Sequence, residues 1–324
     1  MIGGRLTLRS NSNLQMFFRK LFSSRNIELL SPTTVESMSS MPEGEVPPQP
    51  KRSEGGFNEL EDAESQFLLL KALSKSKKQV ERLERGPEFL ELNRFKDVPA
   101  FGDTLVWLGD GTRSPENYVH ANLVELGGLQ GSKTSFFAAQ APTEKGVRNF
   151  LRMIAEKKVK LVVSLVSSPE VETRCERFWP EDSGTFNFGE QKVTCSSVEK
   201  SEFFERRSLK ISTRGKKSHR FEHLHFFSWG DKSAPDPRSL PSLLALFDEV
   251  ETSSELHSCP ILVHCVAGIG RTGTFIAAYF LTRKPQRGFE AKSVFEVCSK
   301  IRECRYKAVQ KLEQYVFLTE LQKY

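Results

Sequence analysis

"CPILVHCVAGIGRTGTF", residues 259–275, joins an apolar run to a helical pattern through a short loop. The apolar run ends at His264 and has the length and composition of a strand that is buried on both faces. The loop carries Gly268 and Gly270, and a helical pattern begins near Arg271. A buried strand that leads through a loop into a helix is a building unit of α/β proteins, so the stretch predicts that fold class.

Further apolar runs and helical patterns alternate along the chain before and after this stretch. Strands that are interleaved with helices predict an α/β layer fold whose central sheet is at least partly parallel. The predicted strands cover 134–140, 159–166, 223–229 and 259–265. The predicted helices cover 60–84, 143–157, about 239–253, 271–283, 291–303 and 311–323.

Length and composition exclude several classes of protein. With 324 residues the chain can bury a core, as one large domain or two small ones. No run approaches the roughly 20 apolar residues of a membrane helix. The six cysteines show neither zinc spacing nor a disulfide framework, so we expect a reducing, cytoplasmic environment. The net charge of +6 comes without the dense basic stripe of a nucleic-acid binder, so no nucleic-acid partner is expected.

The first 56 residues differ in composition from the rest. Residues 1–26 contain several arginines, one lysine, no acidic residue and an apolar cluster at 16–22. This composition is typical of a mitochondrial transit peptide and equally of a basic disordered tail. Residues 27–56 are rich in Pro, Ser, Gly and Glu, which favours a linker. We therefore expect a tail and linker over 1–56 and one folded domain over 57–324.

The loop after the strand has the residue types of a phosphate site with a nucleophile. In open α/β sheets, ligands bind at the carboxyl ends of the strands. Gly268 and Gly270 let backbone N–H groups converge on one anion, and the planar guanidinium of Arg271 matches two phosphate oxygens. The same positive surroundings lower the pKa of a thiol from its usual value of about 8.5, which makes Cys265 a candidate nucleophile. Phosphoryl transfer to sulfur, followed by hydrolysis, is the reaction implied.

Two other interpretations of the loop are weaker. A nucleotide-binding P-loop needs Gly-Lys-Ser/Thr after its glycines, whereas Arg271 and Thr272 follow here. Cys265 could also be a buried structural thiol, although that would leave its combination with the two glycines and the arginine unexplained.

"VHCVAGIGRTG", residues 263–273, resembles the signature of the protein tyrosine phosphatases, whose usual form is HC-S-A-G-x-G-R-[ST]-G. A cysteine and an arginine at this spacing also occur in dual-specificity and lipid phosphatases, but six further blocks resemble the tyrosine-specific family in the expected order. They are "LNRFKDV" (92–98, phosphotyrosine-recognition loop), "NYVHANLV" (117–124), "FFAAQAPTEKGVRNFLRMI" (136–154), "TRCERFWPED" (173–182, similar to KCxxYWP), "HLHFFSWGD" (223–231, mobile acid loop) and "AVQKLEQYVF" (308–317, glutamine loop).

The resemblance covers roughly residues 60–324 and implies a non-receptor, single-domain phosphatase. Its fold would be a central, highly twisted mixed β-sheet flanked by helices. Cys265 would attack phosphorus, Arg271 would bind the phosphate oxygens, and Asp231 would act as general acid and then as base. The other implied site residues are His264 (orients the cysteine), Thr272 (eases departure of the sulfur), Gln310 and Gln314 (position water), Val266, Ala267, Gly268, Ile269 and Gly270 (phosphate-binding N–H groups), Phe95 (pocket wall) and Asp97 (accepts substrate N–H groups).

The chain departs from the family pattern at several positions. Val266 replaces a serine but keeps its backbone N–H, so we expect a tuned thiolate and not a dead site. Phe95 replaces a tyrosine and loses only a hydroxyl contact. Gly230 replaces the proline of Trp-Pro-Asp, which loosens the acid loop by about 0.4–1 kcal/mol. Ala141 replaces the glycine of Gln-Gly-Pro, a change we expect to be structural.

One departure concerns the partner of the phosphate-loop arginine. The family's acidic residue, six positions before the cysteine of KC, is absent, because Pro169 stands there and Glu170 follows it. Whether the arginine keeps its ion pair is therefore left open by the sequence.

The leading hypothesis is an active phosphatase that acts on phosphotyrosine proteins. A pseudophosphatase that binds phosphotyrosine with little turnover is the alternative, motivated by Val266, Phe95 and Gly230. Dual-specificity or phosphoinositide hydrolysis is disfavoured by the 92–98 and 308–317 blocks. No cofactor and no metal are expected, no membrane span is expected, and a monomer is expected because coiled-coil heptads are absent. The cytoplasm is the expected location, with the mitochondrion as the alternative.

Overall fold

The computed structural model describes residues 59–76, 87–126, 133–253, 256, 259–283 and 289–323 of the chain. The predicted tail and linker, 1–56, lie outside the described residues, so the division of the chain at residue 56 stays a prediction. The end of the first predicted helix, 77–84, also lies outside them. Within the described residues no helix is both long and apolar enough to cross a bilayer.

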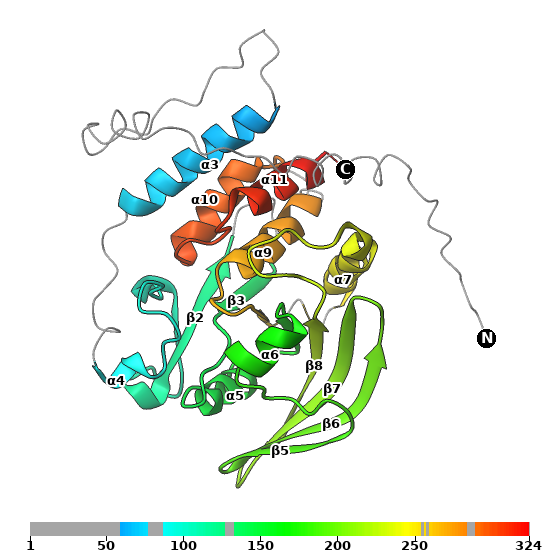
Figure 1. Ribbon diagram of the computed structural model, residues 1–324. Coiled ribbons are helices and arrows are strands. Elements are labelled where there is room, and N and C mark those ends of the chain that lie inside the picture. The colour runs from blue at the N-terminus through cyan, green and yellow to red at the C-terminus, as the bar shows by residue number, and fades with distance from the viewer. Residues whose placement is uncertain are drawn as a thin grey trace, which may run out of the picture. The chain divides into compact units, whose positions relative to one another are not determined.

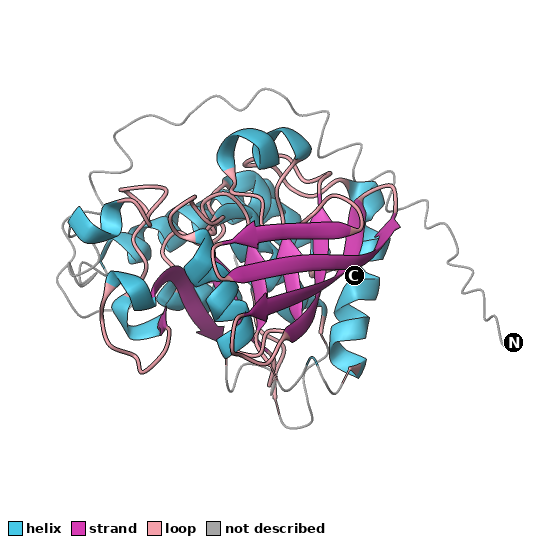
Figure 2. Ribbon diagram, turned by 90° about the horizontal axis from the view of Figure 1, so that it is seen from below, coloured by secondary structure: helices cyan, strands magenta, loops and turns pink. Residues whose placement is uncertain are grey.

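A single mixed sheet forms the centre of the described part of the chain (Figures 1 and 2). Its strand order is β1-β2-β3-β9-β4-β8-β7-β6-β5. The strands are β1 (Leu105–Trp107), β2 (Tyr118–Glu125), β3 (Ser135–Ala139), β4 (Leu161–Ser164), β5 (Gly184–Phe188), β6 (Gln191–Lys200), β7 (Phe204–Thr213), β8 (His219–Phe226) and β9 (Ile261–His264).

Parallel pairing is confined to the middle of the sheet. Strands β3, β9, β4 and β8 are parallel neighbours, and all other neighbours are antiparallel. Strands β4 and β9 are buried at every position, because helices cover the middle of a parallel sheet on both faces. The carboxyl ends of the four parallel strands therefore meet at one edge, and His264 stands there at the end of β9.

The helices lie on both faces of this sheet. The crossover from β3 to β4 moves along the sheet in one direction, and that from β8 to β9 moves in the other. Because such crossovers are right-handed, their helices α5 and α7 belong to opposite faces. Helices α3, α9, α10 and α11 contact one another and are drawn together in Figure 1. The described helices of four or more residues are α3 (Glu59–Ser76), α4 (Pro87–Leu90), α5 (Val147–Glu156), α6 (Ser168–Arg174), α7 (Leu240–Thr252), α9 (Gly270–Thr282), α10 (Val294–Cys304) and α11 (Leu312–Leu321).

The predicted α/β class and the mixed sheet are confirmed. The four strands taken from apolar runs are the four parallel strands, with different ends. Strand β8 spans His219–Phe226 and not 223–229, because Phe227 and Ser228 already belong to a turn that leads into the acid loop. Strands β1, β2 and β5–β7 were not predicted as strands, and helices α4 and α6 were not predicted as helices.

Candidate active site

The phosphate-loop candidate, residues 265–270, connects the end of β9 to the start of α9. Gly268 has a φ of 69°, in the left-handed region that favours glycine. A Cβ atom at this position would lie 2.1 Å from the carbonyl oxygen of Ala139 in β3. A glycine is therefore required for the loop to pack against the neighbouring strand.

The thiol of Cys265 lies at the bottom of this loop and is only 3% exposed. The backbone N–H of Gly268 donates to its sulfur at 3.2 Å. Burial by itself would raise the pKa of the thiol, but the charge of Arg271 and the polar groups of Thr272 and Ile269 outweigh it. The pKa of Cys265 is thus held below its usual value, as expected for a nucleophilic cysteine.

The guanidinium of Arg271 is fixed by two elements that lie far away in the sequence. It donates to both carboxylate oxygens of Glu170, at 2.6 and 2.7 Å. It also donates to the carbonyl oxygen of Trp229, at 2.9 Å, and lies 3.5 Å from a carboxylate oxygen of Asp231. The question that the sequence left open is answered here, because Glu170 supplies the ion pair although it stands one position later than the family pattern.

Helix α6 brings two charged residues to this place. Glu170 closes a capping box at its start, where its carboxylate accepts from the N–H and the hydroxyl of Ser167 at 2.9 Å. Burial would raise the pKa of Glu170, but the bonds from Arg271 and Ser167 hold it below its usual value. Arg174, in the last turn, donates to Asp231 at 3.3 Å. One short helix therefore contacts both Arg271 and Asp231.

The acid loop follows β8 and is anchored on both sides of Asp231. The indole N–H of Trp229 donates to the carbonyl oxygen of Ser233 at 2.9 Å, and the hydroxyl of Ser233 donates to that of Gly230. The amide of Gln314 donates to the same Ser233 carbonyl at 3.3 Å, which ties the loop to α11. The side chain of Asp231 stays 39% exposed, so an entering substrate can reach it.

The two glutamines of the 308–317 block lie over the start of α9. A Cβ atom on Gly270 would lie 3.1 Å from the amide nitrogen of Gln314 and 3.3 Å from the amide oxygen of Gln310. The backbone N–H of Val309 donates to Ile269 at 3.1 Å and holds this segment against the phosphate loop. Both glutamine side chains therefore lie against Gly270, where the phosphate loop enters α9.

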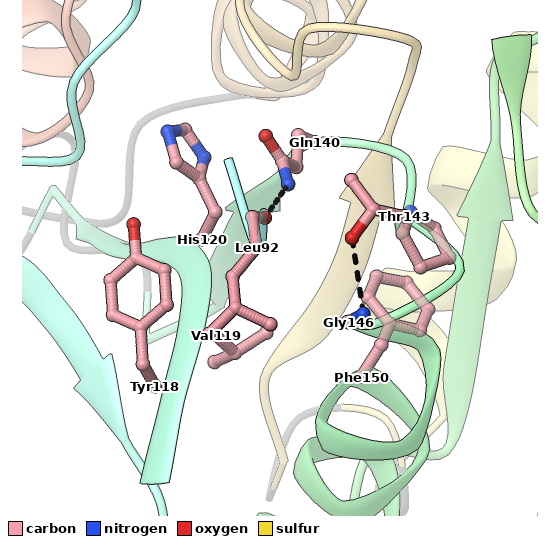
Figure 3. A pocket seen from close by; sticks show the side chains of 9 residues that line it. Leu92, Tyr118, Val119, His120, Gln140, Thr143, Gly146 and Phe150 are labelled. Atoms are coloured by element: carbon pink, nitrogen blue, oxygen red, sulfur yellow. Dashed lines mark hydrogen bonds between the residues drawn. The ribbon is translucent and has the colours of Figure 1, made fainter. Parts of the chain in front are cut away.

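The recognition loop, residues 92–98, is held by Gln140 at the end of β3. The Gln140 amide oxygen accepts from the N–H of Arg94 at 3.0 Å, and its nitrogen donates to the carbonyl of Leu92 at 2.6 Å (Figure 3). The cavity behind it, about 10 Å³, has room for no more than a water molecule. Phe95 packs against the main core cluster, a group of buried side chains that includes Val119, Phe137 and Phe150. The side chain of Asp97 is 78% exposed and lies 3.9 Å from Lys307.

The remaining predicted residues all lie in or under the phosphate loop. Val266 belongs to the main core cluster, and its carbonyl accepts from Ala141 at 3.0 Å. Thr272 is fully buried in the first turn of α9. His264 lies with Nδ1 3.3 Å from the carbonyl oxygen of Cys265. In the described residues no group of three or more His, Cys, Asp or Glu side chains could hold a metal ion.

The sequence analysis missed a buried arginine that supports the loop from beneath. Arg305 donates to the carbonyl oxygens of Gly268 and Ala267, at 2.9 and 3.1 Å. It also donates to Asn122 at 2.8 Å and lies 3.1 Å from Nδ1 of His120, both in β2. Burial and the charge of Arg305 lower the pKa of His120 to about 3. No local sequence signal distinguishes Arg305 from the surface cations around it.

The sequence profile of the protein-tyrosine phosphatase family matches residues 89–322. The mouse tyrosine-protein phosphatase non-receptor type 5 is 30% identical over 237 residues, which are 72% of this chain and 42% of that protein. The chicken receptor-type tyrosine-protein phosphatase eta is 33% identical over 231 residues, which are 70% of this chain and 16% of that protein. The chain thus spans less than two thirds of the length of these curated relatives.

Solved structures agree with the sequence comparison. A Trypanosoma brucei protein tyrosine phosphatase matches with a TM-score of 0.69 and 30% identity, covering 81% of this chain and 90% of its own. The catalytic domain of the human protein tyrosine phosphatase non-receptor type 18 matches with a TM-score of 0.68 and 29% identity, covering 82% and 96%. The profile match over most of the chain and the shared fold show that this chain belongs to the protein-tyrosine phosphatase family.

Proposed function

We propose that this chain hydrolyses phosphotyrosine in proteins through a phosphocysteine intermediate. The observation that carries the proposal is the convergence of three groups: a thiol with a lowered pKa, an arginine fixed beside it, and an aspartate in contact with that arginine. Family membership supports the same reaction. The human non-receptor type 18 enzyme has been solved in complex with HER2 phosphopeptides, which favours phosphotyrosine proteins as the substrate class here.

In the first step the Cys265 thiolate attacks phosphorus. The S–P bond forms while the bond from phosphorus to the tyrosyl oxygen breaks, and that oxygen takes the electron pair and a proton from Asp231. Arg271 and the N–H groups of the phosphate loop bind the remaining phosphate oxygens. Positioning and charge stabilisation supply most of the catalysis in such a transfer.

In the second step a water molecule attacks the phosphocysteine. Asp231, now a carboxylate, takes one proton from the water, and Gln310 and Gln314 hold the water in line. The S–P bond breaks, its electron pair returns to Cys265, and inorganic phosphate leaves. The hydroxyl of Thr272, which is buried and has no other hydrogen-bond partner in the described residues, would donate to the returning thiolate.

Two residues of the 92–98 loop, half-buried Phe95 and exposed Asp97, would select the phosphorylated side chain. Phe95 would form a wall against the tyrosine ring, and Asp97 would accept backbone N–H groups of the substrate peptide. Cys265 is 3% exposed, so the shorter side chains of phosphoserine and phosphothreonine would not bring their phosphates to its sulfur.

The test is turnover of a phosphotyrosine peptide by the full chain, measured as released phosphate. We expect activity in the wild type, none in Cys265→Ser, and a loss of about 10²–10⁴-fold in kcat for Asp231→Ala, the usual contribution of a general acid. Cys195→Ser is the matched control, because Cys195 is a buried thiol in β6 whose pKa burial raises. It should keep full activity.

Two outcomes would contradict this function. Tight peptide binding by the wild type without release of phosphate would make the chain a phosphotyrosine-binding protein. Equal rates on phosphothreonine peptides or phosphoinositides would place it among phosphatases of broader specificity.

We propose the cytoplasm as the site of action. All six cysteines are free thiols, which suits a reducing compartment. Fractionation of cells that express the full chain with a C-terminal tag tests this, and a shortened chain inside mitochondria would contradict it. The monomeric state stays a prediction, which sedimentation of the purified chain can check.

A further inference from the structure

A chain of buried polar side chains runs beneath the nucleophile. Ser164 is the last residue of β4 and pairs in register with His264, the last residue of β9. Its hydroxyl oxygen lies 2.6 Å from Nε2 of His264 and 2.8 Å from Nε2 of His223, in β8. All three residues are 0% exposed. The other end of the His264 ring reaches the carbonyl oxygen of Cys265.

The carbonyl oxygen of Cys265 fixes the direction of every hydrogen bond among these side chains. A carbonyl oxygen only accepts, so Nδ1 of His264 must carry the proton. In a neutral imidazole the other nitrogen is then an acceptor, and the hydroxyl of Ser164 must donate to it. The Ser164 oxygen in turn accepts from Nε2–H of His223.

Two further observations agree with this direction. In this arrangement Nδ1 of His223 carries no proton. Of the four ring nitrogens of His223 and His264, it alone has no hydrogen-bond partner in the described residues. Burial lowers the pKa of His264 to about 3 and that of His223 well below its usual value. Both rings are therefore neutral at pH 7, which the assignment of donors and acceptors requires.

This row of hydrogen-bonded side chains ends at the peptide bond that leads into the phosphate loop. The carbonyl of Cys265 and the N–H of Val266 belong to one planar trans peptide and point in opposite directions. Holding the carbonyl on the side of His264 therefore directs the N–H to the opposite side. The site described above needs that N–H for the phosphate.

We propose that Ser164 is a positioning residue for the nucleophile: its hydroxyl keeps His264 in the Nδ1–H form and so holds the Cys265–Val266 peptide in place. As far as turnover is concerned, the inference rests on the proposed function. Without the hydroxyl, His264 can move its proton to Nε2, and an unprotonated Nδ1 then faces the carbonyl oxygen and repels it.

The surroundings offer no substitute donor among the described residues. The ring of His264 lies against the rings of Phe150 and Phe178, with centroids 5.5 and 6.0 Å away, and Trp179 lies 4.4 Å from the ring of His223. The ionisable groups whose charges act on His264 are His225, Arg271 and Arg94. None of these contributes a hydrogen bond to Nε2 of His264.

The first test is the pKa of Cys265, measured as the pH dependence of its alkylation by iodoacetate in the full chain. We expect Ser164→Ala to raise this pKa by about one unit, a tenfold loss of thiolate at low pH, and Ser164→Thr to restore it. On phosphotyrosine peptide, kcat/KM should fall about tenfold in the alanine variant, with its acid limb moved to higher pH.

Ser208→Ala is the matched control, because it removes another strand serine whose hydroxyl donates to Glu222 at 2.8 Å. It should leave the pKa of Cys265 unchanged. A Ser164→Ala protein that keeps the wild-type pKa would overturn the proposal, and so would a threonine variant that behaves like the alanine one while melting normally.

The second test needs no variant and no turnover. Nitrogen-15 NMR of the wild-type chain should show His264 protonated at Nδ1 and unprotonated at Nε2 at pH 7. The opposite tautomer would overturn the inference. Because neither the alkylation nor the NMR experiment depends on phosphate release, a chain without phosphatase activity would refute the proposed function and leave this inference standing.

Discussion

Arg271 has the strongest effect on the reactivity of Cys265 at the scale of single residues. Burial opposes the thiolate and the arginine favours it, so removal of the arginine leaves the burial effect unbalanced. We expect Arg271→Ala to move the pKa of Cys265 above that of an ordinary thiol. The rate of Cys265 alkylation rises with pH up to the pKa of the thiol and is constant at higher pH. In the alanine variant this rate should therefore still rise with pH near neutrality.

Arg271→Lys is the companion variant for this prediction. It keeps the charge but has no planar fork for Glu170 and the phosphate. Its thiol pKa should stay close to that of the wild type while kcat/KM falls. Equal thiol pKa values in the alanine variant and the wild type would show that other groups set the reactivity.

The carboxylate of Glu170 has two roles, because it caps α6 and forms an ion pair with Arg271. Removing one partner of a buried ion pair costs about 3–5 kcal/mol. We expect Glu170→Ala to lower the free energy of unfolding by this order and to reduce kcat/KM. Glu172→Ala, on the exposed side of the same helix, should change stability by less than about 0.5 kcal/mol. Urea unfolding of both variants measures the difference.

Sequence reasoning reached the residues of this site that stand in contiguous motifs. Cys265, Arg271 and Asp231 each lie within a short pattern that carries their chemistry. Glu170, Arg305 and Ser164 lack such patterns, because their roles come from partners about 35 to 185 positions away, in other elements. For Glu170 the offset of one position within the family pattern left its role open.

At the scale of elements, the strands differ in how well their patterns predict them. The parallel strands are buried on both faces and stand out as continuous apolar runs. In β6, "QKVTCSSVEK", and β7, "FERRSLKIST", buried positions alternate with less buried ones, and polar residues dominate the composition. Antiparallel strands with one open face therefore escaped a search for apolar runs.

The acid loop is the element where one substitution should change dynamics without changing chemistry. Among the described contacts the backbone N–H of Gly230 donates no hydrogen bond, so a proline at this position would remove none. We expect Gly230→Pro to favour the anchored loop by about 0.4–1 kcal/mol, because proline restricts the released states. If loop closure limits turnover, kcat rises by up to several-fold.

Stopped-flow fluorescence of Trp229 and steady-state kinetics test this prediction together. A control, Lys217→Pro, changes an exposed residue in the turn between β7 and β8, at the other end of β8 from the acid loop, where φ is not positive and the described contacts give the backbone N–H no hydrogen bond. It should leave kcat unchanged. A slower Gly230→Pro enzyme with an unchanged loop signal would contradict the prediction.

At the scale of the whole molecule, four buried histidines couple stability to pH. Burial lowers the pKa of His120, His225 and His264 to about 3, 4 and 3, and that of His223 well below its usual value. Below about pH 6.5 the unfolded chain takes up protons that the folded chain cannot. Stability is therefore full above this pH and falls on acidification, by up to about 1.4 kcal/mol per pH unit for each histidine.

Urea unfolding between pH 7.5 and 5 measures this loss, and its slope gives the number of protons taken up on unfolding. The carboxylates with lowered pKa, such as Glu170, lose their stabilising effect only below about pH 4.5, so the loss in this window comes from the histidines and from the Cys265 thiol, whose lowered pKa acts in the same direction. A stability that is constant across the window would mean that the buried rings accept protons in the folded state.

The phosphate loop implies a sharp contrast in mutational tolerance between neighbouring positions. Its ligand is bound by backbone N–H groups, and the side chain of Val266 belongs to the core. Position 266 should therefore accept several small apolar residues, with effects on folding yield more than on rate. Position 268 should accept glycine alone, since any Cβ would overlap the chain of β3. A library that samples every residue at both positions would separate a site selected for packing from one selected for the path of the backbone.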